Sequence, residues 1–259
     1  MPAHSFLPPP SIAAYVSSIL VFDHPGFNKE FTLPLYANGT PTLVFHSTRA
    51  VRQQSSVSHL SLYGQWIKPD ELRLEPGFQF IAYFLHPVFP RSLFGIKASE
   101  LTNECIELNQ IKQAKAIRLE EQLLNASSLN ERLDLINNFI LRLIQGKKKE
   151  NPKVAYATRQ LQKANDPKAL KKIQNELNTT ERSLQRLFES YVGVSPKMFK
   201  RICQFHAAFQ QINRLQFSSF TELAYSHDFA DQSHFIRVFK EFTGLTPKEY
   251  VKRMLPEND

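Results

Sequence analysis

A segment near the C-terminus occurs twice, and this internal repeat constrains the fold more than any other feature of the sequence. The first copy runs through Leu184–Phe188 and Gly193–Pro196, and the second runs through Phe235–Phe239 and Gly244–Pro247. Equivalent glycines and equivalent prolines are 51 positions apart. Each copy is typical of a helix that ends at glycine and is followed, after Ser-Pro or Thr-Pro, by a new helix. The sequence therefore predicts two copies of one helical unit.

A shorter helix and a tight turn are predicted before each repeated helix. Apolar residues at helical spacing indicate the shorter helix: Ala169, Leu170, Ile173 and Leu177 in the first copy, and Phe220, Leu223, Ala224 and His227 in the second. Thr180 and Asp231 are residue types that cap helix N-termini. Asn178 and Asp228 tolerate the positive φ that such a turn requires. A helix, a short turn and a second helix that exposes Arg and Gln describe a helix-turn-helix unit.

One amphipathic helix, from about Pro196 to Arg214, is predicted between the two units. Its apolar face consists of Phe199, Ile202, Phe205, Ala208, Phe209 and Ile212. A helix of this length is roughly 28 Å long. It can hold two recognition helices about one DNA turn, roughly 34 Å, apart on one face of a duplex.

Residues from about Pro152 to Arg253 resemble the DNA-binding domain of the AraC/XylS family, in which a long helix joins two helix-turn-helix units. The similarity is strongest from Phe229–Phe235 through the helix and the Thr-Pro segment that follow. The sequence departs from the family pattern at Asn178 and Asp228, where glycine is usual, and at Gln174, where a small residue is usual. We expect the longer Gln174 side chain to loosen the packing within the first unit.

Exposed Arg and Gln on the two recognition helices are candidates for reading bases, because Arg can bond guanine and Gln can bond adenine through two hydrogen bonds each. From the residues alone, the candidates on the first helix are Arg182, Ser183, Gln185 and Arg186. The resemblance implies Arg182, Gln185 and Arg186 as its main readers, and Gln232, Ser233 and Arg237, together with His234, on the second. The alternative is an ordinary solvated helix face, and the two equivalent arginines, Arg186 and Arg237, could instead bind phosphate.

Phosphate contacts are predicted beside these readers. The candidates are Lys197, Lys240 and Lys248, assisted by the helix N-termini at Thr180, Ser195 and Thr246. For the lysines, a solvated surface is the alternative.

The N-terminal half has the pattern of short strands and turns. Strands are predicted at 31–36, 41–46, 57–63, 71–74 and 78–85. After Pro8–Pro10, residues Ile12, Tyr15, Val16 and Ile19 predict a short helix that runs into an extended stretch. From Ser99 the pattern becomes helical, with helices at 116–124 and 129–143. We expect an α+β protein with an N-terminal small antiparallel β-barrel or sandwich, flanking helices, and an all-α C-terminal domain.

Three parts are predicted along the chain: an N-terminal sensor or dimerisation domain (1–146), a charged linker (147–152) and the DNA-binding domain (153–259). Residues 89–104 resemble the N-terminal domain of a subset of AraC-type regulators. The helices of 116–145 are the predicted dimer surface, because Ile140, Leu143 and Ile144 approach the linker.

Two kinds of site are considered in the N-terminal domain. The aromatic residues Tyr63, Trp66, Phe80 and Phe84 could line a ligand pocket, or they could simply form the core of a small barrel. The histidines His46, His59 and His86 could meet on a metal, but no compact ligand spacing links them. No nucleophile–base set, phosphate loop or acid pair stands out, so we expect neither catalysis nor a cofactor.

The composition is consistent with a regulator that binds DNA. The net charge of +8 over 259 residues suits a polyanionic partner, although the basic excess is spread along the chain. Cys105 and Cys203 lack metal spacing and suit a reducing compartment, and no signal peptide or membrane span is credible, which predicts a cytoplasmic protein.

The sequence thus predicts a transcription regulator, activator or repressor, that inserts two recognition helices into successive major-groove segments of double-stranded DNA. RNA polymerase, a small-molecule effector and a second copy of the chain are the further candidate partners. The alternatives are control by protein–protein contact alone, and a metal-binding, enzyme-like N-terminal barrel.

Overall fold

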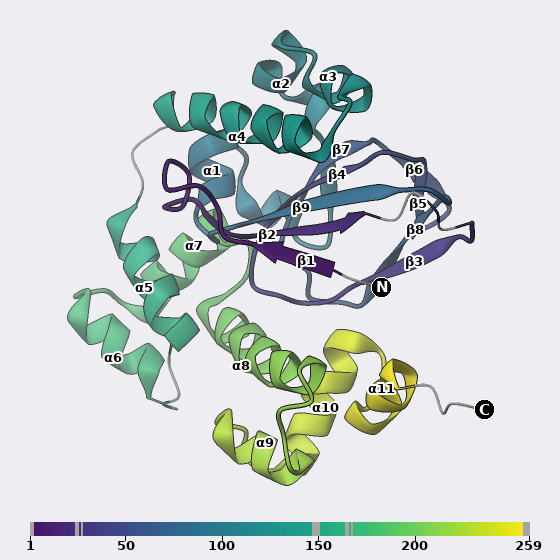
Figure 1. Cartoon of the computed structure of the whole chain (residues 1–259). Coiled ribbons are helices and arrows are strands. Elements are labelled where there is room, and N and C mark those ends of the chain that lie inside the picture. Colours follow the sequence, from purple (N-terminus) through teal and green to yellow (C-terminus); the bar gives the residue numbers. More distant parts are fainter. Residues whose placement is uncertain are drawn as a thin grey trace.

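An N-terminal β-rich region and a C-terminal group of helices make up the molecule (Figure 1). The structure is a computed structural model that describes residues 3–23, 26, 28–146, 151–163, 166 and 168–255. No helix within these residues is long and apolar enough to cross a membrane.

Two antiparallel sheets form the β-rich region. The six-stranded sheet contains, in spatial order, β1 (Ala3–Phe6), β2 (Val16–Asp23), β9 (Gln79–Leu85), β4 (Thr42–His46), β7 (Leu60–Tyr63) and β10 (Cys105–Glu107). The four-stranded sheet contains β3 (Phe31–Leu35), β8 (Asp70–Leu74), β5 (Ala50–Arg52) and β6 (Ser55–Val57).

Strand β4 is buried along its whole length because both faces of its sheet are covered. Leu43 and Phe45 belong to one core, which helix α4 helps to form, whereas Val44 between them belongs to a second core shared with the four-stranded sheet. This alternation is the period of two that a strand imposes. On the neighbouring β9, the Tyr83 hydroxyl donates a hydrogen bond to Asn137 Oδ1 of α4 at 3.0 Å. The sheet therefore presents one face to α4 and the other to the second sheet.

Short helices connect β9 and β10 to the long helix α4. They are α1 (Phe89–Phe94), the 3-10 helices η1 (Ala98–Leu101) and η2 (Leu108–Gln110), α2 (Lys112–Ala116) and α3 (Leu119–Asn125). Helix α4 (Leu129–Gln145) lies across one face of the six-stranded sheet (Figure 1). Ser128 caps its N-terminus by accepting a hydrogen bond from Glu131 N at 3.2 Å.

Helix α8 joins the C-terminal helices to one another. The elements are α5 (Pro152–Lys163), α6 (Ala169–Glu176), α7 (Glu181–Tyr191), α8 (Pro196–Asn213), α9 (Phe220–Ser226), α10 (Gln232–Thr243) and α11 (Pro247–Met254). α8 packs against α5, α7 and α10. Its predicted apolar face is buried, with Phe209 half-buried. At about 1.5 Å per residue it extends roughly 27 Å.

The predicted α+β class is confirmed, and the five predicted strand segments correspond to β3, β4, β6 with β7, β8 and β9. The helix predicted from Ile12 is wrong, because Ile12 lies in a turn, whereas the extended stretch predicted after it corresponds to β2 from Val16. This strand pairs with β9 on one side and with β1 on the other.

Two predictions concern the region between the sheets and the C-terminal helices. Residues 147–150 of the predicted linker lie outside the described residues, and α5 begins at its last residue, Pro152. Ile140 and Leu143, from which a dimer surface was predicted, are buried inside this chain at 1% and 4% exposure. Both lie in the core together with Phe89 and Leu93 of α1, so a second copy cannot contact them.

Candidate nucleic-acid interface and ligand cavity

The first helix-turn-helix unit consists of α6, the turn 177–180 and α7. Asn178 has a φ of 44°, as expected for the turn, and Gly193 beyond the end of α7 has a φ of 94°. Thr180 caps α7, its Oγ1 accepting a hydrogen bond from Ser183 N at 3.2 Å. Local sequence thus accounts for the start and the end of this recognition helix.

The second unit repeats these features in α9, the turn 227–231 and α10. Asp228 has a φ of 62° and Gly244 a φ of 77°, and Asp231 Oδ1 accepts from His234 N at 2.6 Å. The turn before α10 is one residue longer than the turn before α7. The two units are therefore repeats with unequal turns.

The same aromatic contact packs each recognition helix. Phe188 of α7 meets Phe199 with ring centroids 5.9 Å apart, and the equivalent Phe239 of α10 meets Tyr250 at 5.6 Å. Phe188, Phe199 and Phe239 are fully buried. Because equivalent rings are packed inside, each recognition helix is held in a similar rotation about its own axis. That rotation determines which of its side chains are exposed to solvent.

The predicted base-contact residues lie mainly on the exposed faces. Arg182, Gln185 and Arg186 on α7 and Gln232, Ser233 and Arg237 on α10 are exposed, whereas Ser183 and His234 are half-buried.

Three of the candidates already have hydrogen-bond partners. Gln185 Nε2 donates to Glu189 Oε1 at 2.9 Å, and Gln232 Oε1 accepts from Thr221 Oγ1 at 2.9 Å. His234 Nδ1 accepts from the backbone N–H of Ala230 at 3.4 Å, which leaves Nε2 for an external contact.

The N-termini of α8 and α11, both predicted to bind phosphate, differ in whether a carboxylate competes for their backbone N–H groups. Lys197, Lys240, Lys248 and Thr180 are exposed, and Ser195 and Thr246 cap α8 and α11. At α11 the Glu249 carboxylate accepts from Thr246 N at 2.7 Å and from its Oγ1 at 2.8 Å, which lowers the pKa of Glu249. At α8 the equivalent position is Met198, so no carboxylate competes with a phosphate for those N–H groups.

A buried ion pair, which the sequence analysis did not identify, holds the second turn. Lys200 Nζ of α8 lies 3.1 Å from Asp228 Oδ2 and donates to the Asp166 carbonyl at 2.7 Å. Gln204 Nε2 donates to the Asp228 carbonyl at 3.1 Å. Asp228, which stands where the family usually has glycine, thus links the turn to α8 through its carboxylate. Lys200 and Asp228 are 28 residues apart, so no local sequence pattern could predict this ion pair.

The N-terminal region contacts the C-terminal end of the first recognition helix and lies beside that of the second. We call residues 192–195 the first Gly turn and residues 244–246 the second Gly turn. Thr102 Oγ1 donates to the Gly193 carbonyl at 2.7 Å, and the Arg91 guanidinium lies 4.6 Å from the centre of the Tyr191 ring. At the second Gly turn, an added Cβ on Gly244 would lie 3.7 Å from Pro69 Cγ.

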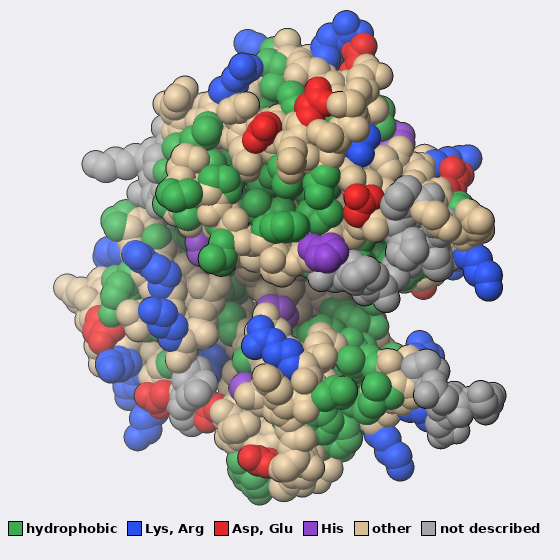
Figure 2. Space-filling model, in the orientation of Figure 1, with side chains coloured by type: hydrophobic (Ala, Val, Ile, Leu, Met, Phe, Trp, Pro, Cys, Tyr) green, Lys and Arg blue, Asp and Glu red, His purple; other side chains and the backbone are tan. Residues whose placement is uncertain are grey.

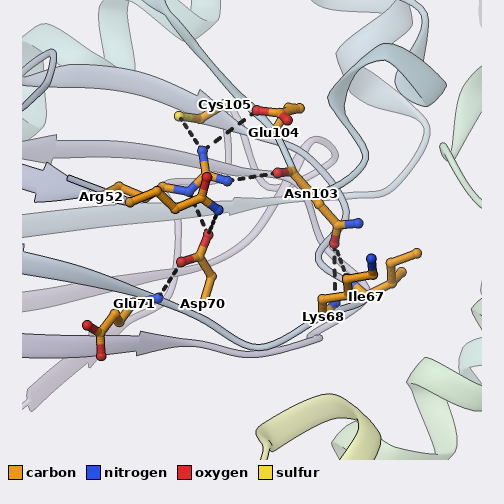
Figure 3. Close-up of polar contacts among 9 residues, drawn as sticks. Arg52, Ile67, Lys68, Asp70, Glu71, Asn103, Glu104 and Cys105 are labelled. Carbon is orange, nitrogen blue, oxygen red and sulfur yellow. Dashed lines mark hydrogen bonds and ion pairs between the residues drawn. The ribbon is translucent and has the colours of Figure 1, made fainter. Parts of the chain in front are cut away.

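One polar network joins the two segments that make these contacts (Figure 3). Arg52 Nε donates to Asp70 Oδ2 at 2.8 Å, and its Nη2 donates to the Asn103 carbonyl at 2.9 Å. The Asn103 side chain in turn accepts from the backbone N–H groups of Ile67 and Lys68 at 2.9 and 3.2 Å. The loop before β8 and the segment before β10 are therefore held together, next to the residues that touch the two Gly turns.

A cavity of about 380 Å³ lies between the two sheets and opens toward α8 and α11. Figure 2 shows the recess between the β-rich region above and the helices below, with hydrophobic side chains gathered on the helical side. The predicted pocket residues Tyr63, Trp66, Phe80 and Phe84 all line this one cavity. That a ligand binds there stays a prediction, because the same residues also belong to the core between the sheets.

Helices α8 and α11 complete the cavity wall with His206, Phe209, Asn213 and Tyr250. The Tyr36 ring from the β-rich region lies 5.5 Å from the Phe209 ring and 6.2 Å from the Tyr250 ring. Burial raises the pKa of Tyr250 to about 12 and lowers the pKa of His206 to about 4. Both groups are therefore uncharged near pH 7.

The histidines weighed as metal ligands do not form a cluster. His46 Nδ1 is bonded to the Thr48 carbonyl at 2.7 Å and His59 Nδ1 to the His46 carbonyl at 2.8 Å, whereas His86 lies against Phe89. Within the part of the chain that the structure describes, no three His, Cys, Asp or Glu side chains are grouped to hold a metal.

Two separate segments of the chain match known protein families. Residues 173–253, from α6 to α11, match a helix-turn-helix domain, and residues 4–107 match a domain of unknown function. No curated protein matches the chain at a significant level.

The solved structures that match this chain share little sequence with it. ToxT from Vibrio cholerae has 14% identity and a TM-score of 0.49, with 99% of this chain and 100% of ToxT covered. ToxT with a bound unsaturated fatty acid has 15% identity and a TM-score of 0.48, with 93% and 96% covered. The AraC-like transcriptional activator CuxR has 12% identity and a TM-score of 0.28, with 77% and 80% covered.

Paired helix-turn-helix units, exposed Arg and Gln on both recognition helices and the matched domain define a DNA-binding transcription regulator. The match of residues 173–253 supports the resemblance of this region to the DNA-binding domain of the AraC/XylS family. Members of this class are normally not enzymes.

Proposed function

We propose that α7 and α10 enter successive major-groove segments on one face of a DNA duplex and read bases through their exposed Arg and Gln side chains. The single observation that carries this proposal is the equivalence of the two helices. Each is rotated by the same buried aromatic contact, and each exposes an arginine at the same repeat position, Arg186 or Arg237. Phosphate contacts supply most of the affinity and are independent of sequence, whereas the base contacts supply the choice of site.

The docked N-terminal region is compatible with this mode of binding. It touches the Gly turns, which follow the C-terminal ends of α7 and α10, whereas the reader candidates cluster in the first two turns of each helix. Arg182, Arg186 and Arg237 remain exposed in the docked arrangement. DNA binding therefore does not require the two regions to separate.

Selection of bound genomic fragments followed by footprinting tests the proposal. We expect protection of two successive major-groove segments. Arg186→Ala should relax base preference in one segment and Arg237→Ala in the other, each by about 1–3 kcal/mol. The matched control is Arg159→Ala on α5, an exposed arginine whose loss changes the net charge equally. Uniform, strongly salt-dependent binding without a preferred site would show that the arginines only hold phosphate.

The N-terminal region is proposed to control DNA binding through a small molecule in the cavity between the sheets and α8 and α11. Residues of both regions line this cavity, so an occupant would contact the sheet and the DNA-binding helices together. Control by protein contact alone, through RNA polymerase or a second copy of the chain, is the competing proposal. Sedimentation of the purified protein, with and without DNA, tests whether a second copy binds.

A further inference from the structure

The residues that line the cavity between the sheets indicate which chemical class of molecule it can bind. This inference rests on the proposed control by a small molecule. Its volume of about 380 Å³ falls within the range of small-molecule sites in proteins. Most of its wall is apolar, and aromatic rings come from both regions, among them Trp66, Phe84, Phe209 and Tyr250. A wall of this kind favours a flat, apolar molecule.

Charge is absent from the cavity wall. Among the described residues that line it there is no Lys, Arg, Asp or Glu, and the one titratable cationic type is His206. Burial keeps the His206 imidazole neutral near pH 7. Arg52 and Arg253 lie behind or beside the wall without lining the cavity. Arg52 is 4.7 Å from the Trp66 ring centre, and its guanidinium is already bonded to Asp70 and Asn103. Arg253 lines a neighbouring hollow with Tyr36 and Tyr250. An ionised ligand would lose its hydration without gaining a counter-charge.

The polar atoms of the wall offer a ligand little. Thr40 Oγ1, Tyr63 Oη and Trp66 Nε1 belong to wall residues, but each of these atoms is itself buried and out of reach of the cavity. Asn213 at the helical side is already engaged, since its Oδ1 accepts from the Tyr250 hydroxyl at 2.7 Å. The accessible wall is therefore mainly apolar and aromatic.

We propose that the cavity binds an uncharged, largely aromatic molecule, and that it discriminates against carboxylates and ammonium ions of the same shape. The aromatic rings of both regions enclose the apolar body, and the lack of a fixed charge in the wall supplies the discrimination.

Three probes of equal shape test this proposal by calorimetry on the full-length protein at pH 7: 2-acetylnaphthalene, 2-naphthoate and protonated 2-(aminomethyl)naphthalene. We expect the ketone to bind at least about tenfold more tightly than either ion, because the cavity offers neither ion a counter-charge. Equal or tighter binding of 2-naphthoate would overturn the proposal. So would the failure of all three probes to bind up to their solubility.

One variant locates the effect. Asn213→Lys places a cation at an exposed position of the wall and should reverse the preference toward 2-naphthoate. An unchanged preference in this variant would overturn the assignment of the cavity. Footprinting of the same preparations separates the outcomes: a protein that protects its operator but binds no probe remains a regulator without this ligand.

Discussion

At the scale of single residues, Asp228 shows how a departure from a family pattern is accommodated. Aspartate tolerates positive φ less well than glycine, yet its carboxylate gains Lys200, and its carbonyl gains Gln204. Lys200 and Asp228 are 11% and 19% exposed in their side chains, so the pair is largely shielded from solvent. Removal of one partner leaves the other charge nearly buried without compensation.

Lys200→Met is therefore expected to lower the free energy of unfolding by about 3 kcal/mol, because the Asp228 carboxylate loses its cation. The double variant Lys200→Met with Asp228→Asn should recover part of this loss, since Asn is uncharged and also tolerates positive φ. Urea denaturation of the wild type, both single variants and the double variant gives the coupling energy. Strictly additive effects would contradict the ion pair.

His206 predicts a pH dependence of stability. Its pKa falls from 6.5 in the unfolded chain to about 4 in the folded protein because of burial. Between these values the unfolded chain binds a proton that the folded chain does not, so stability falls as the pH falls through this window. The loss is up to about 1.4 kcal/mol per pH unit for one group.

Thermal unfolding between pH 4 and pH 7 tests this sign. Other groups titrate in the same range, and His46, whose pKa burial also lowers to about 4, acts in the same direction. The measured quantity is therefore the difference between the wild type and His206→Gln, which should shrink steadily as the pH falls below 6.5. A difference independent of pH would show that the pKa of His206 is the same in the folded and the unfolded chain.

At the scale of elements, the sequence predicted the helical repeat well because its signals are local. Caps, glycines at positive φ and apolar spacing each act within one turn of a helix, and all of them appear as predicted around α7, α8 and α10. The strand β1 (Ala3–Phe6) and the start of the strand at Val16 could not be predicted in this way. The strand at Val16 depends on pairing with β9, which lies far away in the chain, from Leu85 opposite Val16 to Gln79 opposite Asp23, and β1 in turn pairs with the strand at Val16.

The two Gly turns are similar in sequence, but the space around their glycines differs, and glycine-to-alanine variants test this difference. An added Cβ on Gly193 would lie 2.6 Å from the Ala98 carbonyl oxygen, whereas on Gly244 the nearest atom would be Pro69 Cγ at 3.7 Å. Both alanine variants would suffer the strain of a positive φ, about 1 kcal/mol. Only Gly193→Ala must also displace the backbone of η1.

Gly193→Ala should therefore destabilise the protein by clearly more than Gly244→Ala, and each serves as the control for the other. Chemical denaturation measures the pair. Equal losses would mean that η1 moves away from the first Gly turn without cost.

At the scale of the whole molecule, the N-terminal region forms a second connection between the two helix-turn-helix units, in addition to helix α8. Thr102 donates a hydrogen bond to the first Gly turn, Pro69 lies beside the second, and the Arg52 network joins the segments that carry these residues (Figure 3). We propose that this second connection helps to pre-organise the two recognition helices for two major-groove segments.

Loss of this second connection should weaken binding to a complete operator and spare binding to half of it. Thr102→Val removes the hydrogen bond to the Gly193 carbonyl, and Arg91→Ala removes the guanidinium over Tyr191. In the double variant we expect a few-fold loss of affinity for the two-segment site, corresponding to about 1 kcal/mol of lost pre-organisation. Affinity for a single segment should stay the same, because the reader side chains are untouched.

Thr48→Val is the matched control, since it removes a threonine hydrogen bond, to the Glu75 carbonyl at 3.1 Å, at an exposed site within the β-rich region. Hydrogen exchange at residues 192–195 should rise in the double variant and not in the control. Equal loss on half and complete operators would place the effect in α7 itself. Tighter binding to the complete operator would mean that the docked region restrains the helices in an arrangement that DNA has to overcome.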